Sequence, residues 1–132
     1  LIDDDDIIYT RTGSLGLVFR GRRGILHNNS FKVSPKDSLS KDFLFHYLQL
    51  PSFKKKILSL AQRAAQPDIT HKIFKKQVLP MLSHENQKII VNQVEAIKEE
   101  CSRLKEIQVR KLAMLEELKM SILEKAFKGE LD

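Results

Sequence analysis

The sequence predicts an α+β fold with a β-rich first part, which also contains short helices, and a second part that is one long helix. Short runs of β-branched and aromatic residues, separated by glycines, occupy residues 7–33. From Ser38 onwards, apolar residues recur at helical spacing instead. The segment from His84 to Lys128 then contains neither proline nor glycine. We therefore expect two unlike parts, residues 1–82 and residues 83–132.

Three short strands are expected in the β-rich part: residues 7–9, 15–19 and 31–33. The glycines that separate them are Gly13, Gly16, Gly21 and Gly24. Turns between strands often need a positive φ, which glycine adopts without steric cost. We expect this role for Gly13 and Gly16, and no phosphate-binding role.

Short helices are expected next. Residues 43–48 have helical spacing, and a second helix should follow Pro51 with Ser52 as its N-cap. Thr70 is a suitable N-cap for a short helix that runs through Lys75. Residues 78–80 are expected to form a brief edge strand, since Pro80 cannot donate to a β-ladder.

The second part is expected to be one helix from His84 to Lys128, with Ser83 as its N-cap and Gly129 as its stop. At about 1.5 Å per residue it is roughly 65–70 Å long. A helix of this length cannot pack along its whole length on the small first part, so we expect it to pair with another helix. The alternative is a single amphipathic helix on a larger core.

An apolar stripe with the spacing of a coiled coil supports helix pairing. Its apolar members are Ile90, Val94, Ile97, Cys101, Leu104, Leu115, Leu118 and Ile122. Gln108 and Lys111 occupy the two positions in the middle of the stripe. They either fix the register and oligomeric state or mark a shift of the seam.

Positive charge is concentrated in the first part. Residues 1–82 carry 14 Lys and Arg against 7 Asp and Glu, whereas residues 83–132 carry 9 against 10. Four of the seven acidic residues form the run Asp3–Asp6. This distribution indicates a polyanionic partner, with nucleic acid as the first interpretation. The alternative is a basic surface without a specialised partner.

Motifs for catalysis and metal binding are incomplete. The segment His84–Lys88 begins like the zinc motif HExxH but has Lys in the place of the second His. Gly21–Gly24 matches the GxxG loop of KH domains, but its flanks are extended, which favours a turn at a strand end. The single cysteine, Cys101, excludes a disulfide framework and a cysteine-cluster metal site. We expect no enzyme activity, no metal, no cofactor and no membrane association, and a cytoplasmic location.

Several segments resemble the specificity (S) subunits of type I restriction–modification enzymes. Tyr9–Gly16 is similar to the family's TRTGSxG turn, and Phe43–Ile57 to its YLYYL…FKKxI helices. Residues 65–70 resemble its GxxQPNIS segment, and Leu79–Ile90 resembles IPLPPLEEQKxI. Met120–Asp132 is similar to the closing LxxSILxxAFxGEL. Each match is weak, but their order and spacing hold from about residue 5 to the end, so the set is specific.

The chain also departs from the family pattern. Asp68 stands where Asn is usual, and Met81–His84 replaces the usual PxPPL stretch. Such subunits usually have two target recognition domains and two long helices, whereas this chain resembles the end of one domain plus one helix. Because it begins inside a domain and without Met, we expect a piece of a longer subunit or a truncated gene product.

The resemblance implies a function for each part. Residues 1–82 would be the C-terminal part of a target recognition domain that reads a few base pairs of double-stranded DNA. Residues 83–132 would be a spacer and a docking surface for methyltransferase (modification) subunits and, through them, restriction subunits. The S subunit itself does no chemistry. The alternative is an assembly or dimerisation module that no longer binds DNA specifically.

Two interfaces are expected from this reasoning. The candidate DNA contacts lie in glycine-bounded turns or in and beside the segment that resembles QPNIS, and they either read bases or bind phosphates. They are Arg11, Thr12, Arg20, Arg22, Arg23, Gln66, Thr70 and Lys72. The isolated chain is expected to form an antiparallel homodimer, since a parallel pair would stack Lys111 on Lys111.

Overall fold

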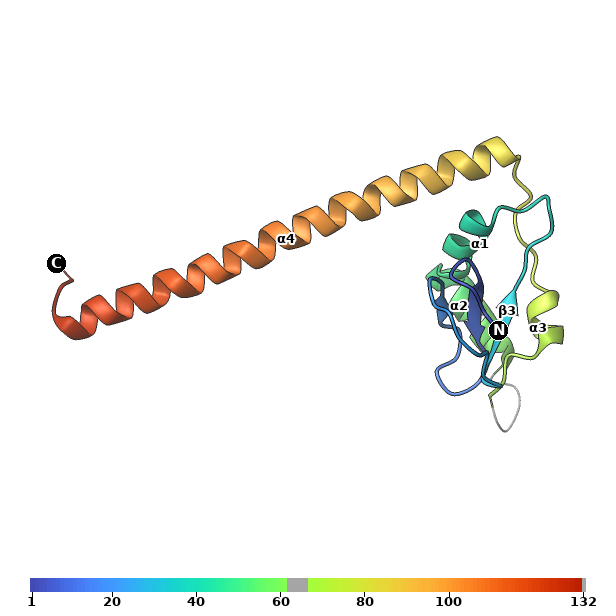
Figure 1. Cartoon of the computed structure of the whole chain (residues 1–132), viewed down its shortest axis with the longest axis horizontal. Helices are drawn as coiled ribbons and strands as arrows, with labels where there is room; N and C mark the ends of the chain where they lie inside the picture. Colours follow the sequence, from blue (N-terminus) through green and yellow to red (C-terminus); the bar gives the residue numbers. More distant parts are fainter. Residues whose placement is uncertain (62–66, 132) are drawn as a thin grey trace. The chain divides into compact units, whose positions relative to one another are not determined.

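The computed structural model describes residues 1–61 and 67–131 and confirms the predicted α+β fold (Figure 1). The chain divides into two compact units, Leu1–Val91 and Asn92–Asp132. The first unit contains a small sheet, three short helices and the first two turns of a long helix. The rest of that helix makes up most of the second unit.

The sheet has three antiparallel strands in the order β2-β1-β3. They are β1 (Ile7–Thr10), β2 (Val18–Phe19) and β3 (Ser30–Val33). In the central strand, Tyr9 pairs with Val18 on one side and with Phe31 on the other. The predictions for residues 7–9 and 31–33 are therefore confirmed.

The predicted strand at residues 15–19 is longer than the observed β2, because a tight turn precedes Val18. Gly13 and Gly16 both have positive φ, 70° and 71°, as predicted. The N–H of Leu17 donates to Thr10 Oγ1 (2.9 Å), and Thr10 Oγ1 donates to the carbonyl of Ser14. Thr10 of β1 also donates its N–H to the Leu17 carbonyl (3.0 Å) and accepts the N–H of Gly16 at its own carbonyl (3.0 Å). The turn is thereby fastened to the end of β1, and the regular ladder of β2 is confined to Val18–Phe19.

The first three helices are α1 (Lys41–Leu48), α2 (Pro51–Ala61) and α3 (His71–Lys75). The prediction of Thr70 as an N-cap is confirmed, since its Oγ1 accepts the N–H of Ile73 (3.2 Å). The prediction of Ser52 as an N-cap is wrong. Helix α2 begins at Pro51, whose fixed φ suits the first helical position, so Ser52 lies inside the first turn.

The predicted edge strand at residues 78–80 is also wrong, because this segment is irregular. Val78 and Pro80 are exposed and would bury little in a sheet, whereas Leu79 packs against the core from the irregular chain. The start of the segment is held to α3 by Gln77, whose Nε2 donates to the Ile73 carbonyl (2.8 Å).

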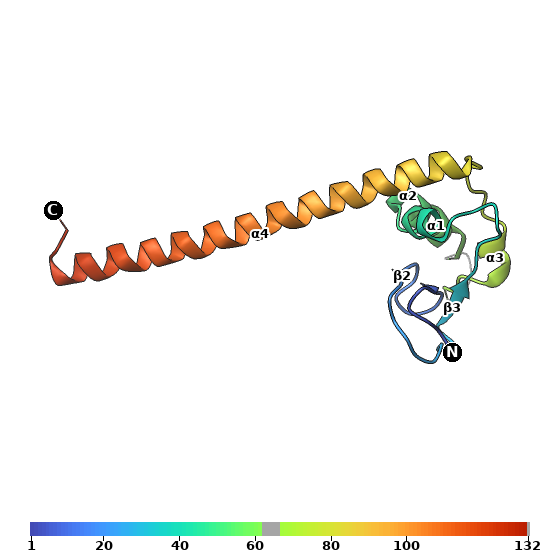
Figure 2. The same ribbon diagram turned by 45° about the horizontal axis from the view of Figure 1, so that its top comes forward.

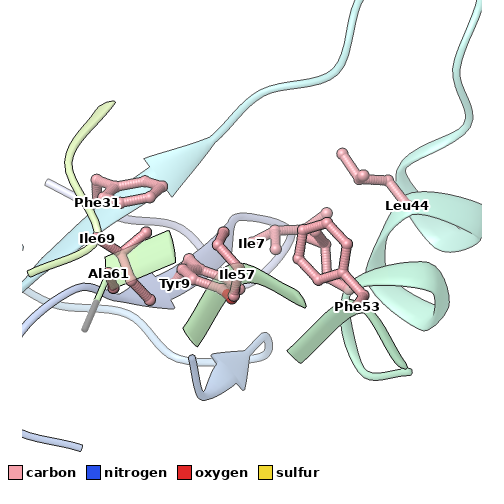
Figure 3. Close-up of a cluster of buried hydrophobic side chains, with 9 residues drawn as sticks. Ile7, Tyr9, Phe31, Leu44, Phe53, Ile57, Ala61 and Ile69 are labelled. Carbon is pink, nitrogen blue, oxygen red and sulfur yellow. The ribbon is translucent and has the colours of Figure 1, made fainter. Parts of the chain in front are cut away.

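The core of the first unit lies between the sheet and the helices (Figure 3). Figure 2 shows α1 and α2 on one side of the sheet. The buried cluster consists of Ile7, Tyr9, Phe31, Leu44, Leu48, Phe53, Ile57, Ala61 and Ile69. The Tyr9 ring stacks on Phe31 with 5.6 Å between ring centroids and meets Phe53 edge-on at 6.5 Å. The central strand is thereby packed against both its neighbour β3 and helix α2.

The long helix α4 runs from His84 to Lys128, as predicted. Ser83 caps its start by accepting the N–H of Asn86 (3.3 Å), and the helix ends one residue before Gly129. In the described part of the chain, no helix combines the length and the apolar character that crossing a membrane requires.

Gln87 is the one α4 side chain that is buried, with 1% of its surface exposed. Its Oε1 accepts the N–H of Ser40 (2.8 Å), and its Nε2 donates to the carbonyls of Ser38 (3.0 Å) and Leu82 (2.9 Å). Gln87 thereby binds the first turn of α4 to the segment that leads into α1.

Candidate nucleic-acid interface

Arg11, a predicted DNA contact, lies just after β1 and is held by Asp68. Its Nε donates to Asp68 Oδ1 (3.0 Å) and its Nη2 to Asp68 Oδ2 (2.6 Å). Both side chains keep 28% of their surface exposed. The hydrogen bonds from Arg11 lower the pKa of the Asp68 carboxyl below its ordinary value. The N–H of Ile69 also donates to the Arg11 carbonyl (3.0 Å), so this pair fastens the segment before α3 to the end of β1.

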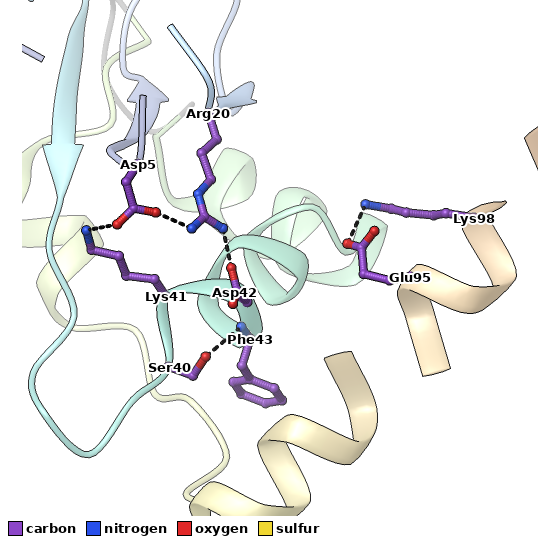
Figure 4. Close-up of polar contacts among 8 residues, drawn as sticks. All are labelled: Asp5, Arg20, Ser40, Lys41, Asp42, Phe43, Glu95 and Lys98. Carbon is purple, nitrogen blue, oxygen red and sulfur yellow. Dashed lines mark hydrogen bonds and ion pairs between the residues drawn. The ribbon is translucent and has the colours of Figure 1, made fainter. Parts of the chain in front are cut away.

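Arg20 follows β2 and lies between two carboxylates (Figure 4). Its guanidinium binds Asp5 and Asp42, and Asp5 also binds the ammonium group of Lys41. The guanidinium carbon lies 5.9 Å from the centroid of the Phe45 ring. Hydrogen bonds from Lys41 and Arg20 lower the pKa of Asp5 to about 2, so the Asp5 carboxylate is ionised at neutral pH.

Arg22 and Arg23, in the turn after β2, are exposed and differ in their contacts. Arg23 Nε lies 2.8 Å from Asp4 Oδ2. Arg22 lies over the Phe19 ring, 5.6 Å from its centroid, and pairs with no carboxylate among the described residues. Three of the four predicted arginine contacts are therefore in ion pairs, and Arg22 is available to an incoming anion.

The other predicted contacts lie at or near α3. Thr70 is exposed in part, but its hydroxyl accepts the N–H of Ile73 as the N-cap of α3. Lys72 is exposed on α3. Thr12 is half-buried, and its Oγ1 has no hydrogen-bond partner within the described part of the chain. Gln66 lies outside the described residues.

Exposed lysines on α2 and α3 supply further cations, of which the sequence analysis singled out only Lys72. Those on α3 and just after it, Lys72, Lys75 and Lys76, are exposed and form no ion pair with a carboxylate of residues 1–61 or 67–131. The same holds for Lys55 and Lys56 on α2. The spacing of Lys72, Lys75 and Lys76 was a usable signal, because residues three and four apart lie on the same face of a helix. These lysines carry uncompensated positive charge, whereas the arginines near β2 are largely neutralised.

A shallow groove between β3 and α3 joins one of these lysines to aromatic side chains. Its lining includes Phe31, Lys32, His71, Phe74 and Lys75. The His71 ring lies 4.9 Å from the Phe31 ring, centroid to centroid. Lys32 at the groove pairs with Asp6 at 2.7 Å. Lys75, the other lysine that lines the groove, pairs with no carboxylate among the described residues.

The predicted stripe on α4 is largely exposed. Ile97, Cys101, Leu104, Leu115, Leu118 and Ile122 are exposed, and Ile90 and Val94 are half-buried. A second apolar face, which the sequence analysis missed, contains the exposed Val109, Met120 and Phe127. At about 100° per residue it lies roughly 140° around the helix from Leu104. Leu112 and Leu123, at roughly 80° and 100° from Leu104, are also exposed, so apolar side chains continue around the helix from the stripe to this second face.

No group of three or more His, Cys, Asp and Glu side chains suited to a metal ion occurs among the described residues. The chemistry that the first unit offers is ionic and hydrogen-bonding contact with an anion. Guanidinium and ammonium groups on a rigid sheet-and-helix body are the groups that bind nucleic-acid phosphates.

Comparisons with known proteins agree with this interpretation. A family model described as "Type I restriction modification DNA specificity domain" matches residues 1–113. No curated protein matches the chain. A solved chain, from work on the "complex assembly" and "conformational transition of the type I R-M system", is 24% identical with a TM-score of 0.78. The match covers 98% of this chain and 32% of that one, so this chain spans about a third of that chain's length. That likeness shows the fold, and the family model, which matches most of the chain, shows that the protein belongs to the type I restriction–modification DNA specificity domains.

Proposed function

We propose that this chain is a DNA-recognition element of a type I restriction–modification specificity subunit. The match of the specificity-domain model to residues 1–113 carries the proposal, because it includes the basic first unit and part of α4. In this role the chain binds duplex DNA and directs methyltransferase and nuclease subunits to a target without doing chemistry itself. Such work takes place on cellular DNA, in the cytoplasm.

We assign DNA binding to the part before α4, residues 1–82. The lysines of α2 and α3 and Arg22 contact phosphates, because their charge is not compensated by described carboxylates. Arg11 holds the segment at Asp68 in place, and Thr70 caps the N-terminus of α3, the helix that carries Lys72 and Lys75. Phosphate contacts of this kind position a protein on DNA, whereas base contacts from neighbouring turns supply the sequence preference.

We assign assembly to residues 83–132. In an antiparallel pair centred between residues 109 and 110, Leu104 faces Leu115 and Ile97 faces Ile122, while Gln108 meets Lys111 at the centre. Cys101 also faces Leu118, so six of the eight apolar positions meet apolar positions, which favours this register for a homodimer of the chain. The other two, Val94 and Ile90, face Lys125 and Gly129. The second apolar face, at Val109, Met120 and Phe127, is left for the modification subunits.

Selection of bound duplexes from a random library, followed by sequencing, tests the proposed function. We expect a short enriched sequence and binding that weakens steeply with salt. Binding without enrichment would favour an assembly module that contacts phosphates only. Absence of binding at 50 mM salt would contradict the proposal.

A further inference from the structure

The acidic run Asp3–Asp6 lies against two arginines and a lysine of the first unit. Asp4 pairs with Arg23 (2.8 Å), and Asp5 pairs with both Arg20 and Lys41. Three elements supply these cations: Arg20 directly follows β2, Arg23 lies in the next turn, and Lys41 is the first residue of α1. The run reaches all of them because it directly precedes β1, the central strand of the sheet.

The backbone of the run is fixed by hydrogen bonds of its own. The N–H of Gly21 donates to the Asp4 carbonyl (2.8 Å), and the N–H of Asp6 donates to the Asp3 carbonyl (3.0 Å). Asp6 itself is buried, accepts the N–H of Asp3 (2.9 Å) and pairs with Lys32 (2.7 Å). The segment therefore keeps its place without the side chains of Asp4 and Asp5.

Asp4 and Asp5 differ from Asp6 in their exposure. Their side chains keep 59% and 60% of their surface exposed, so another anion can reach the same cations from solution. Ion pairs this exposed contribute little to folding stability. The geometry is that of an anion-binding site whose present occupants include Asp4 on Arg23 and Asp5 on Arg20 and Lys41. Figure 4 shows Asp5 between Arg20 and Lys41, and Asp42 on the other side of the Arg20 guanidinium.

We propose that Arg20, Arg23 and Lys41 form a phosphate-binding site in which Asp4 and Asp5 stand in for DNA phosphates. Guanidinium and ammonium groups bind phosphate oxygens with the same N–H donors that bind carboxylates. Duplex DNA takes the site by displacing the two carboxylates. The inference rests on the proposed function, because the ligand is the phosphodiester of the bound DNA.

The competition has a functional consequence. When the carboxylates are displaced they attract salt cations, and this uptake offsets part of the counterion release that drives DNA binding. The run thereby weakens binding to every DNA sequence equally. Because the penalty is the same for target and non-target DNA, the ratio of the two affinities is unchanged, and the run lowers the occupancy of all DNA at a given salt concentration.

The double variant Asp4→Asn with Asp5→Asn tests the inference by measuring DNA affinity and its salt dependence on the full chain. We expect tighter binding and a salt slope steeper by about one to two units. If the slope of log affinity against log salt is steeper by one unit, the ratio of variant to wild-type affinity is about four times larger at 50 mM salt than at 200 mM salt. Adding Lys41→Ala to the double variant should remove part of this gain.

Asp3→Asn is the matched control. It removes a charge from the same run, but the Asp3 side chain forms no ion pair with any residue that the structure describes. If the gain in DNA affinity of the double variant is no larger than twice the gain of Asp3→Asn, the inference is overturned. Weaker DNA binding by the double variant would also overturn it. If the inference fails but the wild type still binds DNA with a sequence preference, the proposed function stands. If neither the wild type nor any variant binds DNA, the proposed function is contradicted.

Carboxyl ¹³C chemical shifts of the wild type give a second readout that needs no variant. On addition of duplex DNA, the Asp4 and Asp5 carboxyl signals should move as their ion pairs break, while the signal of the exposed Asp37 stays in place. Unchanged Asp4 and Asp5 signals at saturating DNA would also overturn the inference.

Discussion

Replacement of Gln87 by alanine tests how the start of α4 is held in the first unit. The side chain is almost fully buried and makes three hydrogen bonds, with Ser40, Ser38 and Leu82. Truncation removes all three and leaves one N–H and two carbonyls without this partner. A lost hydrogen bond costs about 1 kcal/mol net when water replaces part of it. Since Ser38 is exposed, we expect water to enter and a total loss of roughly 3 kcal/mol.

Urea unfolding followed by tyrosine fluorescence measures this loss in the first unit, because both tyrosines of the chain, Tyr9 and Tyr47, lie there. Gln93→Ala is the matched control, since Gln93 is an exposed glutamine of the same helix. We expect the control to change the free energy of unfolding by less than about 0.5 kcal/mol. Equal effects of the two variants would refute the role assigned to Gln87.

Gln87→Glu separates hydrogen bonding from packing. At pH 7 a carboxylate would still accept the N–H of Ser40 but would face the carbonyls of Ser38 and Leu82 without a donor. The folded state therefore favours the protonated form, and the variant should regain stability relative to the wild type as the pH falls through the raised pKa of Glu. A stability difference that does not change with pH would contradict this reasoning.

Further predictions concern the turn, the carboxylates and the helix. Gly13→Ala should cost about 1 kcal/mol of unfolding free energy because φ is 70° there. Gly16→Ala should cost more, since φ is 71° and the new Cβ would lie 3.3 Å from the Tyr9 hydroxyl; equal losses in urea unfolding would contradict this. The pKa values of Asp5, Asp6 and Asp68 are lowered by their hydrogen-bond partners, so stability should be constant above about pH 4 and fall toward pH 2. A melting temperature that stays level from pH 5 to pH 2 would show that these contacts do not stabilise the fold. Leu104→Glu with Leu115→Glu should give monomers in sedimentation, whereas the wild type should be dimeric at tens of micromolar. Oxidation of the wild type should not join two Cys101 residues within a dimer, because the proposed antiparallel register would place them roughly 25 Å apart.

Local features of the fold were predictable from the sequence. The N-caps Thr70 and Ser83 and the positive φ of Gly13 and Gly16 depend on residue type and close neighbours. The long helix follows from an unbroken run of residues without proline or glycine. Val78–Pro80 shows the limit of such patterns, because a strand needs a partner that the local sequence does not specify.

Long-range pairing accounts for what the sequence did not reveal. Gln87 appeared as part of a failed zinc motif, and its role depends on backbone groups as far as 49 residues away. Arg11 and Arg20 appeared as exposed DNA contacts, but the fold brings Asp68 to Arg11 and both Asp5 and Asp42 to Arg20. Charge composition indicates an anionic partner, whereas only the folded chain separates compensated cations from uncompensated ones.

The salt dependence of DNA binding by the variant Lys72→Ala with Lys75→Ala and Lys76→Ala tests the central claim most directly. The claim is that the uncompensated lysines at α3 contact the phosphates of bound DNA. Each phosphate contact contributes about 0.9 to the slope of log affinity against log salt, so the triple variant should lose between two and three units, or roughly 2.7 for three contacts. The exposed Lys105, Lys119 and Lys125 of α4, replaced together by alanine, provide a control with the same change in charge. A lower slope in the α3 variant with an unchanged slope in the α4 variant is the predicted result, and equal slopes in the wild type and the α3 variant would contradict the account.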